Sequence, residues 1–274
     1  MIDAQTELYG VLGNPVRHSL SPVIHNSAFR KMGLNAVYLA FEVKNLKAAM
    51  EGIREFGIRG VSVTVPFKTE ALPFLDEIDV LAEKIRAINT IVNQGGKLIG
   101  YNTDWSGALM ALEEWIDLKD KRVLLIGAGG AARAIGFGLK EKGAEIFISN
   151  RSHERGEQLA RELKAVFQPS IDGLEADVLI NATSIGMYPQ PEATPFPKEF
   201  LKEGMIVMDI VYQPLETRLL KEAERKGCLA INGLEMLLYQ AAAQIEIWTG
   251  RKADVLNIRE SLQRAVTPME ERHD

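Results

Sequence analysis

Several features that mark particular classes of protein are scarce in this sequence. Cys228 is its only cysteine, so no disulfide can form within the chain, and a cysteine-rich zinc site is not expected. The histidines lack the spacing typical of metal ligands; they are His18, His25, His153 and His273. We therefore expect a protein of a reducing compartment that needs no metal.

Positive charge and long apolar runs are also lacking. The 32 Lys and Arg residues stand against 37 Asp and Glu, and this formal net charge of -5 argues against nucleic acid or an anionic membrane as a partner. No apolar stretch has the length of a membrane span, and the opening residues MIDAQTELYG lack the basic and apolar regions of a signal peptide. These absences predict a soluble, cytoplasmic protein in which local cations must hold any anionic ligand.

The first half of the chain alternates between strand-like and helix-like segments. Its 274 residues, 46% of them hydrophobic, are enough for two domains. The expected strands are residues 8–13, 36–43 and 60–66, and the expected helices are residues 22–33 and 45–57. Residues 88–102 hold two short apolar runs around a glycine-rich turn, which predicts an antiparallel hairpin in a mostly parallel sheet.

A second alternation follows the hairpin. We expect a long amphipathic helix over residues 104–118 and then strands at 121–127, 144–150, 176–183 and 205–212. The change from a hairpin pattern to a helical pattern predicts a domain boundary near Asp104. The charged tail, residues 268–274, is expected to fray.

The clearest local motif lies at the start of the second alternation. Gly127, Gly129 and Ala132 fill a G-x-G-x-x-A pattern between an apolar strand and a helix, and a second strand closes the unit. Glycines let the backbone turn tightly and approach a pyrophosphate, which the free N–H groups of the helix N-terminus receive. The motif therefore predicts a dinucleotide-binding domain.

The end of the second strand indicates which dinucleotide is bound. NAD-binding domains carry an acidic residue there for the ribose hydroxyls, whereas this sequence reads NRSHER. Arg151 and Arg155 suit a 2′-phosphate because guanidinium matches phosphate geometry, and Asn150 and Ser152 can add hydrogen bonds. This favours NADP over NAD.

Two serines, Ser19 and Ser21, lie shortly after the first expected strand. Pro22 suits the first position of the following helix, so Ser21 falls at the N-cap, while Ser19 has no such role. In an extended segment the two hydroxyls point to the same side and could serve one ligand. A capping serine beside a surface serine remains the alternative.

Lys68 follows another strand, residues 60–66. Val61, Val63 and Val65 are expected on one face of that strand, with Ser62 and Thr64 on the other. If a helix begins at Lys68, the lysine opposes the helix dipole, so local stability does not explain it. Ligands of open α/β sheets bind beyond the carboxyl ends of strands, which favours a functional lysine over an ordinary surface one.

Two further polar residues flank the hairpin. Asn89 precedes its first strand, and Asp104 follows its second. Each also has a structural interpretation: Asn89 can satisfy backbone groups within the hairpin, and Asp104 is a good N-cap for the helix that follows.

Taken in order, the motifs resemble the shikimate dehydrogenase family over nearly the whole chain. The resemblance is carried by GNPVRHSLSP, GVSVTVPFK, AINT, GYNTDWSG, GAGGAARA with NRS, NATSIGM, DIVYQPLET and NGLEMLLYQAA. One position departs from it, because the family usually has asparagine where this chain has Ser62, and a shorter side chain there is expected to reshape the pocket wall.

The resemblance implies two α/β domains facing a cleft. A mostly parallel substrate-binding sheet comprises residues 1–103 and is completed by residues 237–274, and a Rossmann NADP-binding domain comprises residues 104–236. The implied activity is the reversible, NADPH-dependent reduction of 3-dehydroshikimate to shikimate, without a metal, in the pathway to aromatic amino acids. The protein is expected to be a monomer or a homodimer.

The resemblance also implies the site residues. Lys68 and Asp104 are the catalytic pair, although which is the formal acid stays open. Ser19 and Ser21 bind the substrate carboxylate with Tyr212, and the ring hydroxyls contact Thr64, Lys68, Asn89, Asp104 and Gln240. The implied cofactor residues are Gly127, Ala128, Gly129, Gly130, Ala131, Asn150, Arg151, Ser152, Arg155, Thr183, Ile210 and Gly233. Two alternatives remain: a dual quinate/shikimate dehydrogenase, and a non-catalytic ligand sensor of the same fold.

Overall fold

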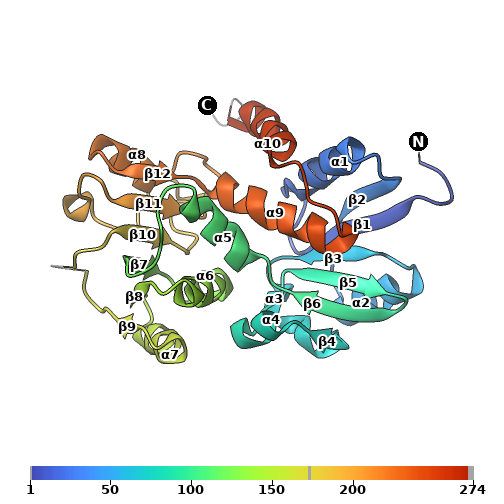
Figure 1. The fold of residues 1–274 in the computed structure, drawn as a ribbon, viewed down its shortest axis with the longest axis horizontal. Helices are drawn as coiled ribbons and strands as arrows, with labels where there is room; N and C mark the ends of the chain where they lie inside the picture. The colour runs from blue at the N-terminus through green and yellow to red at the C-terminus, as the bar shows by residue number, and fades with distance from the viewer. Residues whose placement is uncertain (1, 172–173, 271–274) are drawn as a thin grey trace. The chain divides into compact units, whose positions relative to one another are not determined.

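The computed structural model describes residues 2–171 and 174–270 of the chain, shown as a ribbon in Figure 1. The chain divides into two compact units. The first unit consists of Met1–Thr103 and Leu238–Asp274, and the second unit is Asp104–Leu237. Of the tail expected to fray, residues 271–274 lie outside the described residues, while residues 268–270 continue helix α10 (Val255–Glu270).

The first unit is built on a mixed six-stranded sheet in the order β2-β1-β3-β5-β6-β4. Its strands are β1 (Glu7–Gly13), β2 (Ala36–Glu42), β3 (Gly60–Val63), β4 (Glu77–Ile78), β5 (Thr90–Gln94) and β6 (Lys97–Tyr101). Strand β1 pairs parallel with β2 and β3, and β4 pairs parallel with β6, whereas β5 runs antiparallel to both of its neighbours. The expected hairpin and mostly parallel sheet are therefore confirmed.

Side chains that alternate along β3 pack into two different cores. Val61 and Val63 join Met50 and Ile53 of α2 (Leu46–Glu55) in one apolar cluster. The opposite face carries aromatic rings: Tyr9 lies with its ring centroid 5.0 Å from that of Phe29 and 5.4 Å from that of Trp248. Ser62 faces this second side, where it contacts Tyr38. The predicted division of Val61 and Val63 from Ser62 is thus correct.

The strand itself is shorter than predicted. Strand β3 ends at Val63, and Val65 is 67% exposed instead of sharing the buried face of Val61. The N–H of Thr64 still donates to Leu12 O (2.9 Å), but Pro66 has no N–H with which to continue the ladder. The chain turns there into the short helix α3 (Phe67–Glu70).

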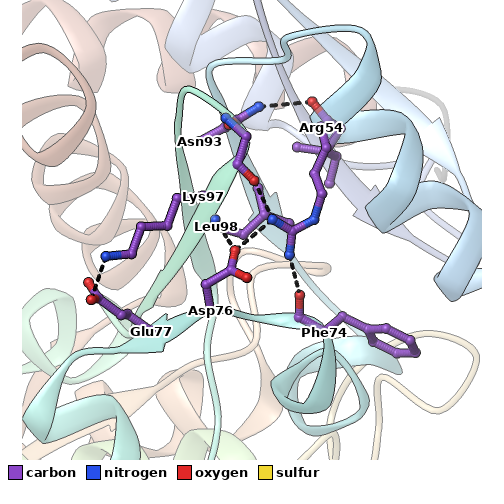
Figure 2. Close-up of polar contacts among 9 residues, drawn as sticks. Arg54, Phe74, Asp76, Glu77, Asn93, Lys97 and Leu98 are labelled. Carbon is purple, nitrogen blue, oxygen red and sulfur yellow. Dashed lines mark hydrogen bonds and ion pairs between the residues drawn. The ribbon is translucent and has the colours of Figure 1, made fainter.

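The turn of the β5–β6 hairpin is fixed by a polar cluster around Arg54 of α2 (Figure 2). The Arg54 guanidinium donates to Asp76 Oδ2 (2.6 Å), to the Phe74 carbonyl (2.9 Å) and to the carbonyl of Gly96. Asp76 also accepts from the N–H of Leu98 (2.6 Å). This cluster holds the tip of the hairpin. Asn89, at the opposite end of the hairpin, therefore belongs to an element whose position is fixed.

Helices cover the first unit on both sides of its sheet. They are α1 (Ser21–Lys31), α2, the short α3 and α4 (Val80–Ile85), the greater part of α9 (Gly233–Thr249), and α10. Helix α9 begins in the second unit and continues into the first, where Trp248 donates from Nε1 to Ile91 O (3.0 Å). A Cβ on Gly60 would clash with that indole nitrogen, so only glycine fits beneath Trp248.

The second unit contains an all-parallel sheet in the order β12-β11-β10-β7-β8-β9. The strands are β7 (Arg122–Ile126), β8 (Glu145–Ser149), β9 (Val166–Phe167), β10 (Val178–Asn181), β11 (Ile206–Asp209) and β12 (Leu229–Ile231). Numbered from β7, this is the 3-2-1-4-5-6 order of dinucleotide-binding sheets. The helices are α5 (Asp104–Glu113), α6 (Gly130–Glu141), α7 (His153–Leu163) and α8 (Arg218–Arg225).

Helix α5 is shorter than the predicted span of residues 104–118, because it ends at Glu113. Trp115 beyond it is 58% exposed, whereas Leu118 is 1% exposed and packs into the core from outside the helix. Within residues 2–171 and 174–270, no helix is both long enough and apolar enough to cross a membrane.

Candidate active site

Predicted substrate residues of the first unit gather beyond the carboxyl ends of β1 and β3. The two strands pair in parallel with Leu12 opposite Val63, so the segments that follow them leave the sheet side by side. The backbone N–H of Asn14 donates to Val65 O (3.1 Å) just past the strands. Thr64 lies in this region, and its methyl carbon would be only 2.6 Å from a Cβ on Gly13.

The structure assigns the side-chain contact at the start of α1 to Ser19 and not to Ser21. Helix α1 begins at Ser21, and its N-cap is Leu20, which makes no side-chain capping bond, so the prediction of Ser21 as N-cap is wrong. Ser19 instead accepts a hydrogen bond at Oγ from the backbone N–H of Ser21 (3.2 Å). A helix start leaves its first N–H groups without intrahelical partners, and Ser19 satisfies one of them. Ser21 lies in the first turn and is 8% exposed.

Lys68 and Asn89 come from neighbouring backbone segments. The Lys68 carbonyl accepts from the N–H of Ile88 (2.8 Å), and the Asn89 carbonyl accepts from the N–H of Val63 (2.8 Å). Lys68 belongs to α3, directly after β3, as the sequence predicted. The geometry therefore brings the lysine and the asparagine to the same edge of the sheet.

The Asn89 side chain is 2% exposed and makes hydrogen bonds at both ends of its amide. Its Oδ1 accepts from the N–H of Thr103 (2.7 Å) and from Thr90 Oγ1 (2.8 Å). Its Nδ2 donates to Thr103 Oγ1 (3.0 Å) and, over a longer distance, to Gln240 Oε1 (3.4 Å). Asn89 thus does support the hairpin backbone, and it also lies beside the predicted substrate residue Gln240.

Sequence reasoning missed a set of buried polar residues behind Asn89. Tyr38, Thr90 and Gln244 belong to this set, and Ser62, which we expected in the pocket wall, lies buried between Tyr38 and Gln244. Gln244 lies one helical turn after Gln240, and this i, i+4 spacing is the signal that could have revealed it.

His25 also belongs to this buried region. Its ring stacks on that of Tyr38 with centroids 4.1 Å apart, and its Nδ1 lies 2.8 Å from the Ser21 carbonyl oxygen. Burial lowers the pKa of His25 to about 4, so the imidazole is neutral at pH 7 and donates from Nδ1 to that carbonyl. Its Nε2 is buried and makes no hydrogen bond of regular geometry, although the Gln244 side chain lies near enough to oppose part of the fall in pKa.

In the second unit, the glycine motif forms the turn between β7 and α6. Gly127 has φ +122°, and a Cβ there would lie 2.9 Å from the Ala182 carbonyl oxygen, so this position needs glycine. Gly129 is the N-cap of α6, and no heavy atom lies within 4 Å of a Cβ built on Gly129 or Gly130. The helix N-terminus is therefore open to a close approach, which fits the pyrophosphate of a dinucleotide. Ala128 lies in the same turn, and Ala131 is the second residue of α6.

The predicted phosphate residues follow β8. Asn150 donates from Nδ2 to the Ser152 carbonyl (2.8 Å), which shapes the loop ahead of α7. Ser152 is the N-cap of α7 but makes no side-chain capping bond. Arg151 and Arg155 are both exposed, so their guanidinium groups are accessible to a ligand phosphate.

A second buried network organises the loops after β10 and β11. Asp209 accepts from Asn181 Nδ2 (2.9 Å), the N–H of Val211 (3.0 Å) and Thr217 Oγ1 (2.8 Å). Burial is the largest influence on this carboxyl and raises its pKa to about 6. Thr183 joins the network by donating from Oγ1 to Asn181 Oδ1 (2.7 Å).

The remaining cofactor positions implied by the resemblance lie at the same loops. A Cβ on Gly233 would lie 2.5 Å from the carbonyl oxygen of Ile210, so a glycine is required where α9 begins. The sequence did not suggest Asp209 or Asn181, since two residues 28 positions apart leave no local pattern.

Asp104 and Tyr212 belong to the second unit. Asp104 is the first residue of α5 rather than the residue before it, and it is 5% exposed. Tyr212 follows β11, where burial raises the pKa of its hydroxyl. In the described part of the chain, no group of three or more His, Cys, Asp or Glu side chains is placed to hold a metal ion.

A parallel sheet in the 3-2-1-4-5-6 order, with an open glycine turn at a helix N-terminus, defines the class: a dinucleotide-binding α/β protein, here joined to a second α/β unit. Family models match three stretches. Residues 11–91 match the shikimate dehydrogenase substrate binding domain, residues 109–191 match shikimate / quinate 5-dehydrogenase, and residues 233–263 match the shikimate 5'-dehydrogenase C-terminal domain.

Individual relatives agree. A shikimate dehydrogenase (NADP(+)) of Pyrococcus furiosus is 46% identical over 261 residues, which cover 93% of this chain and 94% of the relative. A crystal structure of a shikimate dehydrogenase in complex with NADP+ superposes with a TM-score of 0.93 at 46% identity, covering 97% of this chain and 98% of the other. The Thermus thermophilus enzyme in complex with NADP(H) and shikimate gives a TM-score of 0.90 at 39% identity, covering 95% of this chain and 100% of the other. The chain belongs to the shikimate dehydrogenase family.

Proposed function

We propose that this protein is an NADP-dependent shikimate dehydrogenase, which reversibly reduces 3-dehydroshikimate to shikimate on the route to aromatic amino acids. The observation that carries the proposal is the gathering of Thr64, Lys68, Asn89 and Gln240 at one edge of the first unit. A small polyhydroxylated ring needs several convergent donors and acceptors, and this edge supplies them.

The two units have different binding roles. Residues 1–103 and 237–274 form the substrate-binding domain, and residues 104–236 form the NADP-binding domain, which also carries Asp104 and Tyr212. The glycine turn fits the cofactor because Gly127 admits no side chain and the start of α6 is open. Arg151 and Arg155 hold the 2′-phosphate. When bound, NADPH supplies the hydride for the carbonyl carbon of the substrate.

The chain's own residues handle the charge and the proton. Hydride addition leaves negative charge on the former carbonyl oxygen, and the Lys68 ammonium stabilises that charge while Asp104 binds the adjacent hydroxyl. One of the two delivers the proton. Ser19, Ser21 and Tyr212 hold the carboxylate with neutral hydroxyls. A substrate hydroxyl can replace the long 3.4 Å bond between Asn89 and Gln240 without disturbing the shorter bonds of Asn89.

We also propose a cytoplasmic location, supported by the single cysteine, and a small-molecule substrate without a nucleic-acid partner. We propose further that it acts as a monomer or a homodimer.

The experiment is to measure kcat/KM for NADP reduction by shikimate and by quinate, side by side. Quinate carries an extra hydroxyl on the carbon that bears the carboxylate, next to Ser19 and Ser21. An unpaired hydroxyl there costs about 1–3 kcal/mol, so we expect a roughly ten- to hundredfold preference for shikimate. Comparable use of both acids would establish a dual quinate/shikimate dehydrogenase, and binding of shikimate without turnover would establish a sensor.

Ser62 is the observation that keeps the dual enzyme as a second candidate, since the family usually has asparagine there. Ser62 contacts Tyr38 and Gln244 through its hydroxyl and is 7% exposed. If the shorter side chain enlarges the pocket, Ser62→Asn should raise the preference for shikimate above that of the wild type. An unchanged ratio in Ser62→Asn would exclude this position as the source of quinate use.

A further inference from the structure

A row of buried polar side chains crosses the first unit from strand β2 to Asn89. Tyr38 and Thr90 are 0% exposed, Gln244 is 1% exposed and Ser62 is 7% exposed. Burying polar groups is costly unless each is hydrogen-bonded, so a fold that keeps four of them side by side ties their orientations together.

The four residues form one continuous chain of hydrogen bonds that ends on Asn89. Tyr38 Oη donates to Ser62 Oγ (2.6 Å), and Ser62 Oγ donates to Gln244 Oε1 (2.8 Å). Gln244 Nε2 donates to Thr90 Oγ1 (2.9 Å), and Thr90 Oγ1 donates to Asn89 Oδ1 (2.8 Å). These residues come from β2, β3, α9 and β5, and they join elements far apart in the sequence.

Backbone groups fix the direction of this chain. The Asn89 carbonyl can only accept, and Gln244 lies 3.1 Å from it, so the Gln244 amide must turn Nε2 toward Asn89 and Oε1 toward Ser62. Ser62 must then donate to Gln244 and accept from Tyr38. At the other end, the Thr103 N–H can only donate, so Asn89 Oδ1 must face it (2.7 Å).

The orientation of Asn89 in turn decides what it offers at the site. With Oδ1 toward Thr90 and Thr103, Nδ2 points to Gln240 Oε1 at 3.4 Å. If the Asn89 amide were flipped, its Oδ1 would face Gln240 Oε1, and two hydrogen-bond acceptors would lie against each other. The relay from Tyr38 to Thr90 supplies one of the bonds that opposes the flip.

We propose that Tyr38, Ser62 and Gln244 are positioning residues that act together with the Thr103 N–H to hold the Asn89 amide and thereby raise the affinity of the enzyme for the ring hydroxyls of its substrate. None of the three touches the reacting atoms; they act through Asn89. The inference rests on the proposed function, in which Asn89 binds a ring hydroxyl.

The test is a double-mutant cycle between Gln244 and Asn89. Gln244→Met keeps the length of the side chain but removes both ends of the amide. We expect it to raise the KM for shikimate about tenfold, the scale of one lost hydrogen bond, with kcat and the KM for NADP changed by less than about twofold. In an Asn89→Ala background the same change should alter the KM for shikimate by less than about twofold, because the residue through which it acts is gone.

Two further variants separate positioning from general stability. Tyr38→Phe removes a single oxygen atom from the far end of the relay, and it should raise the KM for shikimate in the same direction as Gln244→Met even if the latter folds poorly. Because the Tyr38 hydroxyl also interacts with the Ser21 side chain, this rise should disappear in the Asn89→Ala background if it acts through the relay. Ser27→Ala is the matched control: Ser27 is a buried serine of the same unit whose Oγ lies 2.6 Å from that of Ser261, outside the relay. It should leave the KM for shikimate unchanged.

The outcomes are distinct. An equal rise in KM from Gln244→Met in the wild-type and Asn89→Ala backgrounds, or a rise of the same size in Ser27→Ala, would overturn the relay. If the wild type oxidises no shikimate, the proposed function fails, and the relay is then judged by hydrogen exchange of the Thr103 amide. Faster exchange in Gln244→Met than in Ser27→Ala would support the relay, and equal exchange would overturn it.

Discussion

Acid should destabilise the first unit through one buried residue, His25. Its side chain is 0% exposed and lies against Tyr38, with Phe29 and Trp248 on other sides at ring-centroid distances of 6.3 and 5.3 Å. Removal of the ring from water is the main reason that its pKa falls from 6.5 to about 4. In the unfolded chain the same imidazole takes up a proton near its ordinary pKa.

The sign and size follow from proton linkage. Between pH 6.5 and about 4 the unfolded state binds a proton that the folded state does not, so the stability present above pH 6.5 is lost as the pH falls through this window. A difference of about 2.5 units at about 1.4 kcal/mol each amounts to about 3 kcal/mol of unfolding free energy. That is a large share of the stability of an ordinary domain.

The assay is urea denaturation at pH 7 and pH 4, followed by the fluorescence of Trp248. The other two tryptophans, Trp105 and Trp115, are replaced by phenylalanine in every sample, so the signal reports the first unit alone. His25→Phe keeps a flat ring beside Tyr38 but does not titrate. We expect the wild type to lose about 3 kcal/mol more than His25→Phe between the two pH values.

His153→Phe is the matched control, because this histidine is exposed and belongs to the second unit. It should leave the pH dependence of the Trp248 transition as it is in the wild type. Equal pH dependence in the wild type and His25→Phe would refute the reasoning, since it would mean that the buried imidazole is already charged or that unfolding does not release it.

Two further predictions concern turnover and the cofactor. Lys68→Ala should lower kcat about a hundredfold or more while the KM for shikimate changes less, and near-normal turnover would remove Lys68 from the mechanism; Lys47→Ala, a change at an exposed lysine of α2, is the control. Arg151→Ala should raise the KM for NADP roughly tenfold and leave that for NAD nearly unchanged, because only NADP offers a phosphate. Equal losses for both cofactors would contradict this, and Arg161→Ala, on the exposed face of α7, is the control.

Local sequence patterns predicted the features that depend on neighbours in the chain. The strands before the glycine turn and before Lys68 follow from short apolar runs, and the hairpin follows from the turn at Gly95 and Gly96, which have φ +61° and +95°. Predicting the position of Lys68 beyond β3 required only an apolar strand and the proline that follows it. These elements are specified by side-chain periodicity and turn chemistry, which a single sequence displays.

Features set by tertiary hydrogen bonds were predicted wrongly or missed. The end of β3 at Val63 was predicted too late, because it depends on how far β1 and β5 pair with this strand. The contact of Ser19, and not Ser21, with the start of α1 follows from where α1 begins, one residue earlier than the proline signal placed it. Asp209 was missed because its partners Asn181 and Thr217 are brought to it by the sheet and by a loop.

Helix α9 shows what a local sequence pattern can predict when the tertiary partner of the helix is unknown. Gln240 and Gln244 are four residues apart, so the helical period alone places both on one side of α9. The period does not say what that side faces. Both amides contact Asn89, because α9 passes over the start of β5. Gln240 contacts the Asn89 side chain, and Gln244 contacts the Asn89 backbone carbonyl. A glutamine pair spaced by one turn on α9 is therefore a local signal of a long-range polar network, whose partners Asn89 and Thr90 lie where β5 begins.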